Sequence, residues 1–213
     1  MSTKRELADH SVRDLIAAFS SSDPTPGGGS AAALASALGT SLLIMVSGLA
    51  KTRTGIDSER AALAAAAPPL VALRDRLLQA MDDDTSAYDR VIAAYKLPKA
   101  SAEEQQTRKD AIQAALRGAT DVPLAVVGLS AEALSAAATV ADNGHAGAAS
   151  DVGVAVALLR AGLHGARLNV EINLGSVRDE AYATATRDAI ARLAQQARDA
   201  GDEAERSLAR SGR

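Results

Sequence analysis

The segment from Ser30 to Ala50 carries no charged side chain, and this property strongly limits the folds open to the chain. A bilayer is crossed by about 20 consecutive apolar residues, so the segment is long enough to span one. Its apolar character comes largely from alanine, however, serine and threonine hydroxyls interrupt it, and no belt of aromatic residues marks its ends. We therefore predict a buried helix at a core or subunit interface, and no membrane span.

The remaining composition favours a wholly helical chain. Hydrophobic residues make up 47% of the 213 residues, whereas aromatic residues make up only 2%. Strands are usually rich in β-branched and aromatic side chains, while alanine and leucine favour closely packed helices. No alternating strand pattern of useful length and no internal repeat occurs. We predict an all-α fold, in which residues 1–213 form a single up-and-down type helical bundle domain of about seven helices.

Prolines, glycines and capping residues divide the chain into the expected helices. Pro68 and Pro69 should kink or interrupt a helix that begins near Asp57. Pro123 should lie near the start of a new helix, because proline is favoured in the first turn. The expected helical ranges are 12–19, 30–50, 57 to about 96 with the proline interruption, 101–120, 121–143, 150–173 and 177–208.

One carboxylate lies in the apolar seam of the third expected helix. Positions 70, 73, 77, 80, 84, 87, 91 and 95 follow one another in steps of three and four, and only Asp84 among them is charged. Burial of an unpartnered carboxylate is costly or raises its pKa, so Asp84 needs a hydrogen-bond donor or a functional role. From position alone, a structural bond to a cap or hydroxyl and a catalytic role both remain open.

The residues Pro24-Thr25-Pro26-Gly27-Gly28-Gly29-Ser30 join the first expected helix to the charge-free one. The prolines fix their φ angles, the glycines allow a ligand to approach the backbone, and Ser30 is placed to cap the first helical turn. Free N–H groups at a helix start favour an anionic or oxygen-rich group. The lysine and preceding strand of a phosphate-binding loop are missing. A tight turn that lets two helices touch is the structural alternative.

Three further groups of polar residues are candidates for a site. Ser150 and Asp151 provide a cap and a carboxylate at a helix start, an arrangement that helix structure alone also explains. Asn169 and Asn173 are four residues apart, so both amides project from one helical face. There they can hydrogen-bond the donors and acceptors of a heterocyclic ligand, or they can hydrogen-bond a neighbouring helix. Lys99 lies in an expected surface loop.

Charge and cysteine content argue against several other functions. The formal net charge of −3 and the absence of aromatic residues interleaved with lysine or arginine argue against nucleic-acid binding. No cysteine is present, and His10, His145 and His164 are too scattered to suggest a metal site. The N-terminal residues show no secretion signal. We predict a cytoplasmic protein without metal or redox cofactor.

Several segments, in the same order and spacing, resemble the cyclodeaminase/cyclohydrolase family of folate enzymes. This family includes the cyclodeaminase part of formiminotransferase-cyclodeaminase and stand-alone bacterial methenyltetrahydrofolate cyclohydrolases. The resemblance covers about residues 15–182, and its most specific parts are Pro-Thr-Pro-Gly-Gly-Gly and Asn-Val-x-Ile-Asn. The matching segments are residues 24–30, Leu97-Pro98-Lys99, Asp121-Val122-Pro123-Leu124, residues 150–155 and residues 168–174.

The resemblance implies an all-α homodimer that packs through its helices and holds a tetrahydrofolate derivative in a cleft near the subunit contact. Asp84 falls where the family has an aspartate in an Asp-x-x-Ala-aromatic pattern, which implies a catalytic role in stabilising a cationic folate and moving protons. Asp151 is the second catalytic candidate. The implied substrate-binding residues are Pro26, Gly27, Gly28, Gly29, Ser30, Lys99, Ser150, Asn169 and Asn173.

Two reactions of this family act on the carbon that bridges N5 and N10 of tetrahydrofolate. The segments at 97–99 and 121–124, and the lack of a transferase domain in these 213 residues, favour a 5,10-methenyltetrahydrofolate cyclohydrolase, a hydrolase. The alternative is a formimidoyltetrahydrofolate cyclodeaminase, an ammonia-lyase. Residues 144–147 read Gly-His-Ala-Gly where family members often have Gly-Asn-x-Asn. This change keeps a non-catalytic folate-binding or scaffold dimer as a third possibility.

Overall fold

The computed structural model describes residues 6–211, and its regular structure in this range is helical apart from one isolated bridge between Thr52 and Gly144. The all-α prediction is confirmed. Residues 1–5, part of the segment in which no secretion signal was expected, lie outside the described range. The α-helices are α1 (Val12–Phe19), α2 (Gly28–Ser47), α3 (Asp57–Tyr95), α4 (Ala102–Asn143), α5 (Ala149–Leu174) and α6 (Glu180–Ser211), with short 3-10 helices at Leu7–Asp9 and Ala146–Ala148.

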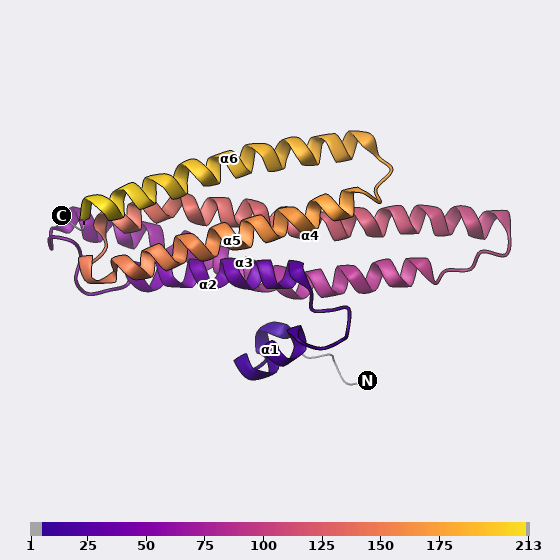
Figure 1. The fold of residues 1–213 in the computed structure, drawn as a ribbon, viewed down its shortest axis with the longest axis horizontal. Helices are drawn as coiled ribbons and strands as arrows, with labels where there is room; N and C mark the ends of the chain where they lie inside the picture. Colours follow the sequence, from indigo (N-terminus) through magenta and orange to yellow (C-terminus); the bar gives the residue numbers. More distant parts are fainter. Residues whose placement is uncertain (1–5, 212–213) are drawn as a thin grey trace.

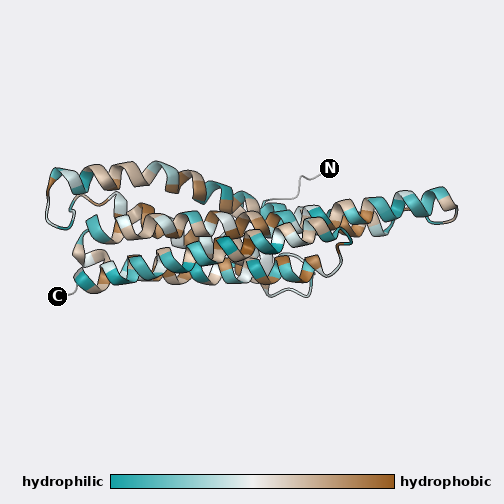
Figure 2. Cartoon of the chain, turned by 90° about the horizontal axis from the view of Figure 1, so that it is seen from above, coloured by the Kyte–Doolittle hydropathy of each residue, from teal (hydrophilic) through white to brown (hydrophobic). Residues whose placement is uncertain are grey.

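The long helices run alternately up and down beside one another (Figure 1). α2, α3, α4 and α5 form a four-helix bundle in which each packs on the next, and α5 closes the ring against α2. α6 lies mainly along α4, while α1 stands off one side of the bundle. The α3–α4 hairpin projects beyond the other helices, and its tip is largely hydrophilic (Figure 2). The hydrophobic core therefore lies in the shared middle of the bundle.

The helix count differs from the expected seven, because residues 6–211 hold six α-helices. Two expected helices, 101–120 and 121–143, are one continuous helix, α4, with Pro123 inside it. Pro123 has no N–H to offer the carbonyl of Ala119, four residues earlier. The Asn173 side chain on α5 supplies the missing donor, with its Nδ2 2.7 Å from Ala119 O. The helix continues because a residue distant in the sequence replaces the lost hydrogen bond.

This compensation can be measured with a double-mutant cycle at positions 123 and 173. In the wild-type background, Asn173→Ala leaves a half-buried carbonyl without its donor, and we expect a loss of about 1–3 kcal/mol in the free energy of unfolding. In the Pro123→Ala background the restored backbone N–H serves Ala119, so the same substitution should cost less than about 1 kcal/mol. Urea denaturation of the four proteins gives both values. Equal costs in the two backgrounds would contradict this account of α4.

α3 likewise continues through Pro68 and Pro69 without interruption. Its far end leads through a short loop to a capping box at the start of α4, as the Ser101–Glu104 spacing predicted. There Glu104 N donates to Ser101 Oγ at 3.1 Å, and the Glu104 carboxylate accepts from Ser101 N at 3.1 Å. The two helices thus form a long hairpin that carries the seam residue Asp84 in its interior.

α2 and α5 approach one another closely because a glycine stands at their contact. A Cβ atom on Gly162 of α5 would lie 2.0 Å from Ser36 Oγ and 2.7 Å from Ala32 O on α2. No real Cβ atom tolerates such distances. The Ser36 hydroxyl also hydrogen-bonds Ser130 on α4 at 2.7 Å. The small residues of α2 therefore bring its start, and the glycine loop before it, directly against α5.

Three helical ranges are long and apolar enough to cross a membrane, judged by length and composition alone: Gly28–Ser47, Ala102–Asn143 and Ala146–Leu174. Within the bundle, 56% of the hydrophobic window is buried in each of the first two ranges, but only 39% in the third. The third range contains α5. A smaller share of this range is therefore buried than of the ranges that contain α2 and α4.

Candidate active site

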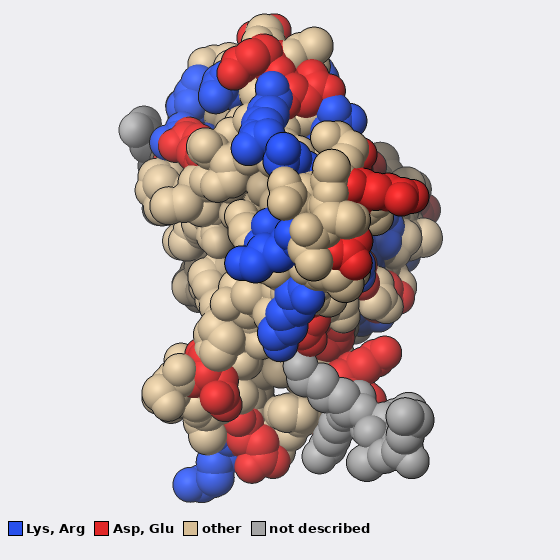
Figure 3. All heavy atoms as spheres, turned by 90° about the vertical axis from the view of Figure 1, so that its right-hand side faces the viewer, with Lys and Arg blue, Asp and Glu red and all other residues tan. Residues whose placement is uncertain are grey.

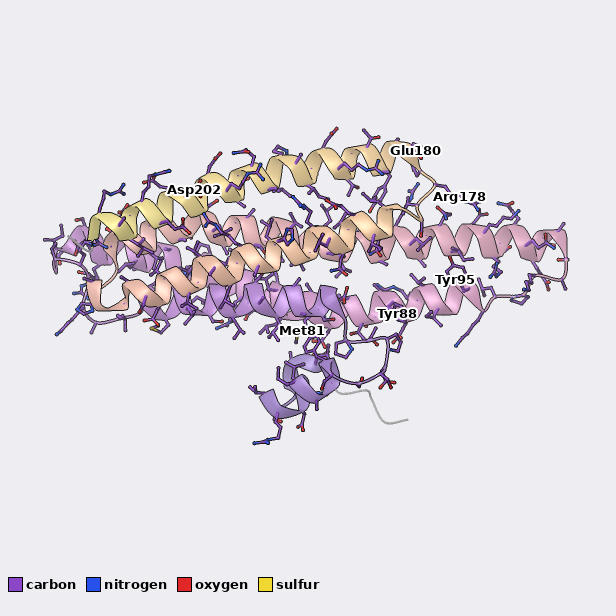
Figure 4. The ribbon with its side chains drawn as sticks, in the orientation of Figure 1. Met81, Tyr88, Tyr95, Arg178, Glu180 and Asp202 are labelled. Atoms are coloured by element: carbon purple, nitrogen blue, oxygen red, sulfur yellow. The ribbon has the colours of Figure 1, made fainter. Side chains whose placement is uncertain are left out.

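A cavity of about 310 Å³ lies where the beginning of α2 meets α3, α4 and α5. The loop between α1 and α2 forms one wall, and α3 carries Met81 and Tyr88 beside that loop (Figure 4). The lining combines backbone of the glycine loop with carboxylate, amide and apolar side chains. The lining residues are Pro24, Thr25, Gly27, Gly28, Gly29, Asp84, Tyr88, Val91, Leu116, Ala119, Asn169 and Asn173.

Asp84 caps the start of α2 from a different helix. The N-cap residue of α2 is Gly27, which has no side chain to offer, so the helix start needs an acceptor from elsewhere. Asp84 Oδ2 accepts from Ser30 N and from Ser30 Oγ, each at 2.9 Å. The anionic group expected at this helix end is thus a carboxylate of the protein itself. Ser30 was predicted to cap the turn, but it binds the capping carboxylate instead.

Burial raises the pKa of the Asp84 carboxyl, and the hydrogen bonds from Ser30 oppose that rise only in part. The carboxylate of Glu59 shows the opposite balance. Burial also disfavours its ionisation, but hydrogen bonds from Thr52, Thr54 and Gly55 prevail and lower its pKa to about 2. Glu59 is therefore a fully satisfied structural anion. The raised pKa of Asp84 is instead a feature that acid/base groups of active sites often share.

The Ser30 hydroxyl can hydrogen-bond the Asp84 carboxyl whether that carboxyl is ionised or protonated. Its Oγ lies 3.0 Å from Met81 O and 2.9 Å from Asp84 Oδ2. A hydroxyl has one proton that rotates and lone pairs that accept. When Asp84 is ionised, the Ser30 hydroxyl donates to it. When Asp84 is protonated, the hydroxyl donates to Met81 O and accepts from the carboxylic acid, so a change of protonation leaves no buried group unpaired.

Glycine is required at position 29 because Asp84 occupies the space of a side chain. A Cβ atom there would lie 2.2 Å from Asp84 Oδ1 and 2.8 Å from Oδ2. The neighbouring Gly28 faces α5, where a Cβ would lie 3.3 Å from Asn169 Nδ2. The three-glycine loop is therefore both a close helix contact and a cavity wall. The close helix contact that the sequence left open is present, and ligand binding by the loop stays a prediction.

The two asparagines of α5 line the cavity with their orientation already fixed. Asn169 Nδ2 donates to Gly165 O at 2.8 Å, and Asn173 Nδ2 donates to Ala119 O at 2.7 Å. Each amide keeps its carbonyl oxygen as an acceptor. Together with Asp84, the pocket therefore offers several oxygen acceptors and favours a ligand with N–H groups or positive charge.

The sequence analysis did not identify the apolar side chains that together line one wall of the cavity. Tyr88 and Val91 lie one and two turns beyond Asp84 on α3, and Leu116 faces them from α4. Tyr88 stands four residues from Asp84, so helical spacing alone could have placed it beside the carboxylate. Leu116 belongs to another helix, and only the packing of α3 on α4 brings it to the site.

Five predicted site residues do not line this cavity. One of them is buried Ser30, which lies behind the lining and hydrogen-bonds Asp84. Pro26 lies in the glycine loop but is not among the lining residues. Exposed Lys99 lies in the α3–α4 loop, beyond the end of α3 at Tyr95, which is about 17 Å along the helix from Asp84. Ser150 and Asp151 lie in the first turn of α5, whose N-cap is Ala148, so Ser150 is not the cap that the sequence indicated. Within residues 6–211, no cluster of three metal-binding side chains occurs.

The candidate site is thus a cavity in an all-α bundle, walled by glycine backbone and amide side chains. Its one carboxyl group, on Asp84, is half-buried and caps a helix start. Residues 11–192 match the profile of the formiminotransferase-cyclodeaminase family. The chain belongs to this family.

Named relatives of this chain include both kinds of folate enzyme. A methenyltetrahydrofolate cyclohydrolase of Methylorubrum extorquens is 39% identical over 175 residues, which are 82% of this chain and 84% of that protein. A formimidoyltransferase-cyclodeaminase of Rattus norvegicus is 33% identical over 195 residues, which are 92% of this chain but 36% of the rat protein. The crystal structure of formiminotetrahydrofolate cyclodeaminase from Thermotoga maritima matches with a TM-score of 0.84 over 95% of this chain and 98% of that one. At 23% identity, this last match shows the fold.

Proposed function

We propose that this protein is a 5,10-methenyltetrahydrofolate cyclohydrolase that forms 10-formyltetrahydrofolate, with Asp84 as its acid/base group. The observation that carries the proposal is the Asp84 carboxyl, which caps the start of α2, has a raised pKa and faces the cavity. The 39% identity to a cyclohydrolase of similar length supports this reaction over others of the family.

The chemistry needs a carboxylate that first takes a proton and then returns it. Water attacks the methenyl carbon between N5 and N10, and Asp84 accepts one proton from the attacking water. The resulting tetrahedral carbon carries a hydroxyl group. Asp84 then protonates N5 while the N5–carbon bond breaks, and the hydroxyl proton leaves to solvent as the formyl C=O forms on N10. Ser30 accommodates both states of the carboxyl during this cycle.

The remaining lining fits a reduced pterin. The carbonyl oxygens of Asn169 and Asn173 can accept from ring N–H and amino groups, and the ionised Asp84 stabilises the positive charge of the methenyl carbon. Tyr88 and Val91 offer an apolar surface for a flat ring. We infer that Gly27 to Gly29 shape the cavity, and that Pro26, Lys99 and Ser150 act at a distance from the reacting carbon. Neither a metal nor a redox cofactor takes part in this mechanism.

The second candidate is formimidoyltetrahydrofolate cyclodeaminase activity. In that reaction N10 attacks the formimino carbon on N5, and the same carboxylate protonates the departing ammonia. The rat relative favours it, but this chain spans 36% of that protein. A non-catalytic folate-binding or scaffold dimer, the third possibility, is favoured only by the altered residues 144–147.

One assay separates these functions. The purified protein is mixed with 5,10-methenyltetrahydrofolate, and loss of near-ultraviolet absorbance is followed against a buffer blank. We expect hydrolysis well above the blank. Hydrolysis equal to buffer together with ammonia release from 5-formiminotetrahydrofolate would reverse the order of the two reactions. Inertness toward both compounds would leave the non-catalytic function.

We also propose that the protein works as a cytoplasmic homodimer, without nucleic acid or membrane as a partner. The chain has no cysteine, which suits a reducing compartment. Acidic and basic side chains are interspersed on the end view of the bundle, so this face carries no patch of one sign (Figure 3). The exposed side chains of Val154, Leu168 and Ile172 on α5 support the homodimer, because a second copy would cover them.

A further inference from the structure

A groove outside the candidate active site runs between α5 and α6. Both helices pack far more extensively on α4 than on each other, so α4 forms part of the floor between them. Two hollows, of about 230 Å³ and about 320 Å³, lie along this groove. Arg167, Ala194 and Arg198 line both hollows, which are therefore continuous. Neither hollow shares a lining residue with the cavity that contains Asp84.

The groove and the active-site cavity lie on opposite sides of α5. Successive residues of an α-helix are turned by about 100° around its axis. Arg167 and Glu171 stand two residues before and two residues after Asn169, so both project about 160° away from it. Asn169 lines the active-site cavity, whereas Arg167 and Glu171 line the second hollow. A small ligand in the groove would therefore not contact Asn169, and the groove is a separate site.

The first hollow has an apolar floor built from three helices. The floor residues are Leu134 of α4, Leu163 of α5, and Ala194 and Ala197 of α6. None of them is more than 8% exposed, so the floor belongs to the core of the bundle. An apolar ring that covers this floor removes both surfaces from water, which favours binding. The rim above the floor is polar and consists of Arg160, His164, Arg167 and Arg198.

The second hollow carries an excess of positive charge. Arg167, Arg187 and Arg198 line it, and Glu171 is the one carboxylate among its lining residues. Within residues 6–211, Arg187 and Arg198 make no ion pair. Arg167 Nε lies 3.4 Å from Glu171 Oε1, but it makes no hydrogen bond with any of the described residues. Three guanidinium groups thus share this hollow with a single carboxylate.

Arg160 shows how the same two helices hold an arginine that serves their own packing. It pairs with Asp202 at 2.6 Å and with Glu205 at 2.5 Å, and both partners lie on α6. No such partner reaches Arg187 or Arg198 among the described residues, although acidic residues outnumber basic ones in the chain, 26 to 23. Neighbouring like charges repel one another, and a bound anion would relieve that repulsion. The guanidinium group is also the side chain best suited to binding phosphate in a fork.

We propose that the groove between α5 and α6 is a second binding site, which takes an organic phosphate. The apolar ring of this ligand lies on the floor of the first hollow, and its phosphate groups bind Arg167, Arg187 and Arg198. Arg167 and Arg198 line both hollows, so the ring and the phosphates must be close together, as they are in a nucleoside triphosphate. Their planar guanidinium groups can also stack on the ring. This site is independent of the proposed function.

Binding of ATP, followed by isothermal titration calorimetry in about 50 mM salt, tests the site. We expect Kd below about 1 mM. Inorganic tripolyphosphate, which carries the charge without the ring, should bind at least about 10-fold more weakly, because it leaves the apolar floor exposed to water. Absence of ATP binding would overturn the proposal. Equal affinity for ATP and tripolyphosphate would also overturn it, because the first hollow would then take no part.

Substitution of the arginines locates the bound phosphates. Arg187→Gln and Arg198→Gln should each weaken ATP binding by about 10-fold or more, because each removes a charged hydrogen bond to phosphate. Arg192→Gln is the matched control, since this exposed arginine lies on the same helix and lines neither hollow. Its Kd should stay within about twofold of wild type. Equal weakening by all three substitutions would show attraction to α6 as a whole and would contradict a defined site.

Asp84→Asn distinguishes this groove from the active-site cavity. The ionised Asp84 carboxylate repels phosphate, so ATP bound in the active-site cavity would bind more tightly once that charge is removed. ATP in the groove should bind Asp84→Asn and wild type with Kd values within about twofold of each other. Tighter binding to Asp84→Asn would place ATP in the active-site cavity and overturn the proposal. These are binding measurements, so their outcome does not depend on whether the chain hydrolyses a folate.

Discussion

Replacing Asp84 by Asn lowers kcat for 5,10-methenyltetrahydrofolate hydrolysis by about 10²–10⁴-fold while substrate binding is largely kept. Asparagine retains an acceptor for Ser30 N, so the cap of α2 survives, but the side chain can no longer take up and return a proton. Steady-state kinetics with wild type and variant gives the ratio. Asp83→Asn is the matched control. Among residues 6–211 the exposed Asp83 bonds only Gln79 on the same helix, so kcat of this variant should stay within about twofold of wild type.

Asp84→Asn should also abolish the decrease of kcat/KM at low pH. The reaction begins with Asp84 ionised, so wild-type kcat/KM falls as pH drops through the pKa of this group, which burial places above its ordinary value. The residual activity of Asp84→Asn should not show this decrease. An unchanged kcat, or an acid limb that persists in the variant, would show that another group moves the proton.

Stability should respond in the opposite direction from activity. The pKa of Asp84 is higher in the folded chain than in the unfolded one, so the fold favours the protonated form. Its contribution to stability is therefore full below the unfolded pKa and is lost as pH rises through the folded value. At pH 7 the uncharged asparagine avoids this penalty, and Tm of Asp84→Asn should equal or exceed that of wild type. Loss of activity then cannot be attributed to unfolding.

The periodicity of α3 is sufficient by itself to single out Asp84. A helix of that length has one face turned to its neighbours, and a charged residue on that face must be half-buried wherever the helix packs. The bounds of α1 follow from the sequence for the same reason. Local spacing and local capping decide both outcomes, and no partner from another element is needed to predict them.

The joining of two expected helices into α4 could not be predicted from local sequence. Pro123 has the same local effect wherever it stands, and it is the amide of Asn173, 50 residues later, that makes a continuous helix possible here. The sequence did indicate that Asn173 projects from one helical face. It could not indicate whether the Asn173 amide would hydrogen-bond a ligand or a carbonyl of a neighbouring helix. In the fold, Asn173 Nδ2 donates to Ala119 O, and the residue also lines the cavity.

The sequence could not show how Asp151 relates to the cavity, and the reason differs from that for α4. A pattern along one chain shows which residues share a helix face, but not which faces meet across a symmetry axis. Asp151 and Asn173 lie near opposite ends of α5, so no arrangement of a single subunit brings both to one ligand.

Gly162→Ala should lower the free energy of unfolding by about 3 kcal/mol and Tm by about 10 °C. The added methyl group would meet Ser36 Oγ at 2.0 Å and the backbone of α2 at 2.7 Å, so side-chain rotation cannot relieve the contact and the helices must separate. Gly118→Ala in α4 is the matched control, because nothing lies within 4 Å of its Cβ position. There the better helix propensity of alanine should raise Tm by about 3 °C.

Separation of α2 from α5 would also disturb the site, because the glycine loop and Asn169 face one another across that contact. We therefore expect Gly162→Ala to raise KM even at temperatures where the protein remains folded, whereas Gly118→Ala should leave KM unchanged. Thermal unfolding by circular dichroism and kinetics at about 15 °C, well below the Tm of a typical domain, give the two readouts. If the variants proved equally stable, the closeness of α2 and α5 would not be what holds the loop, the capping carboxylate and the amides together in one pocket.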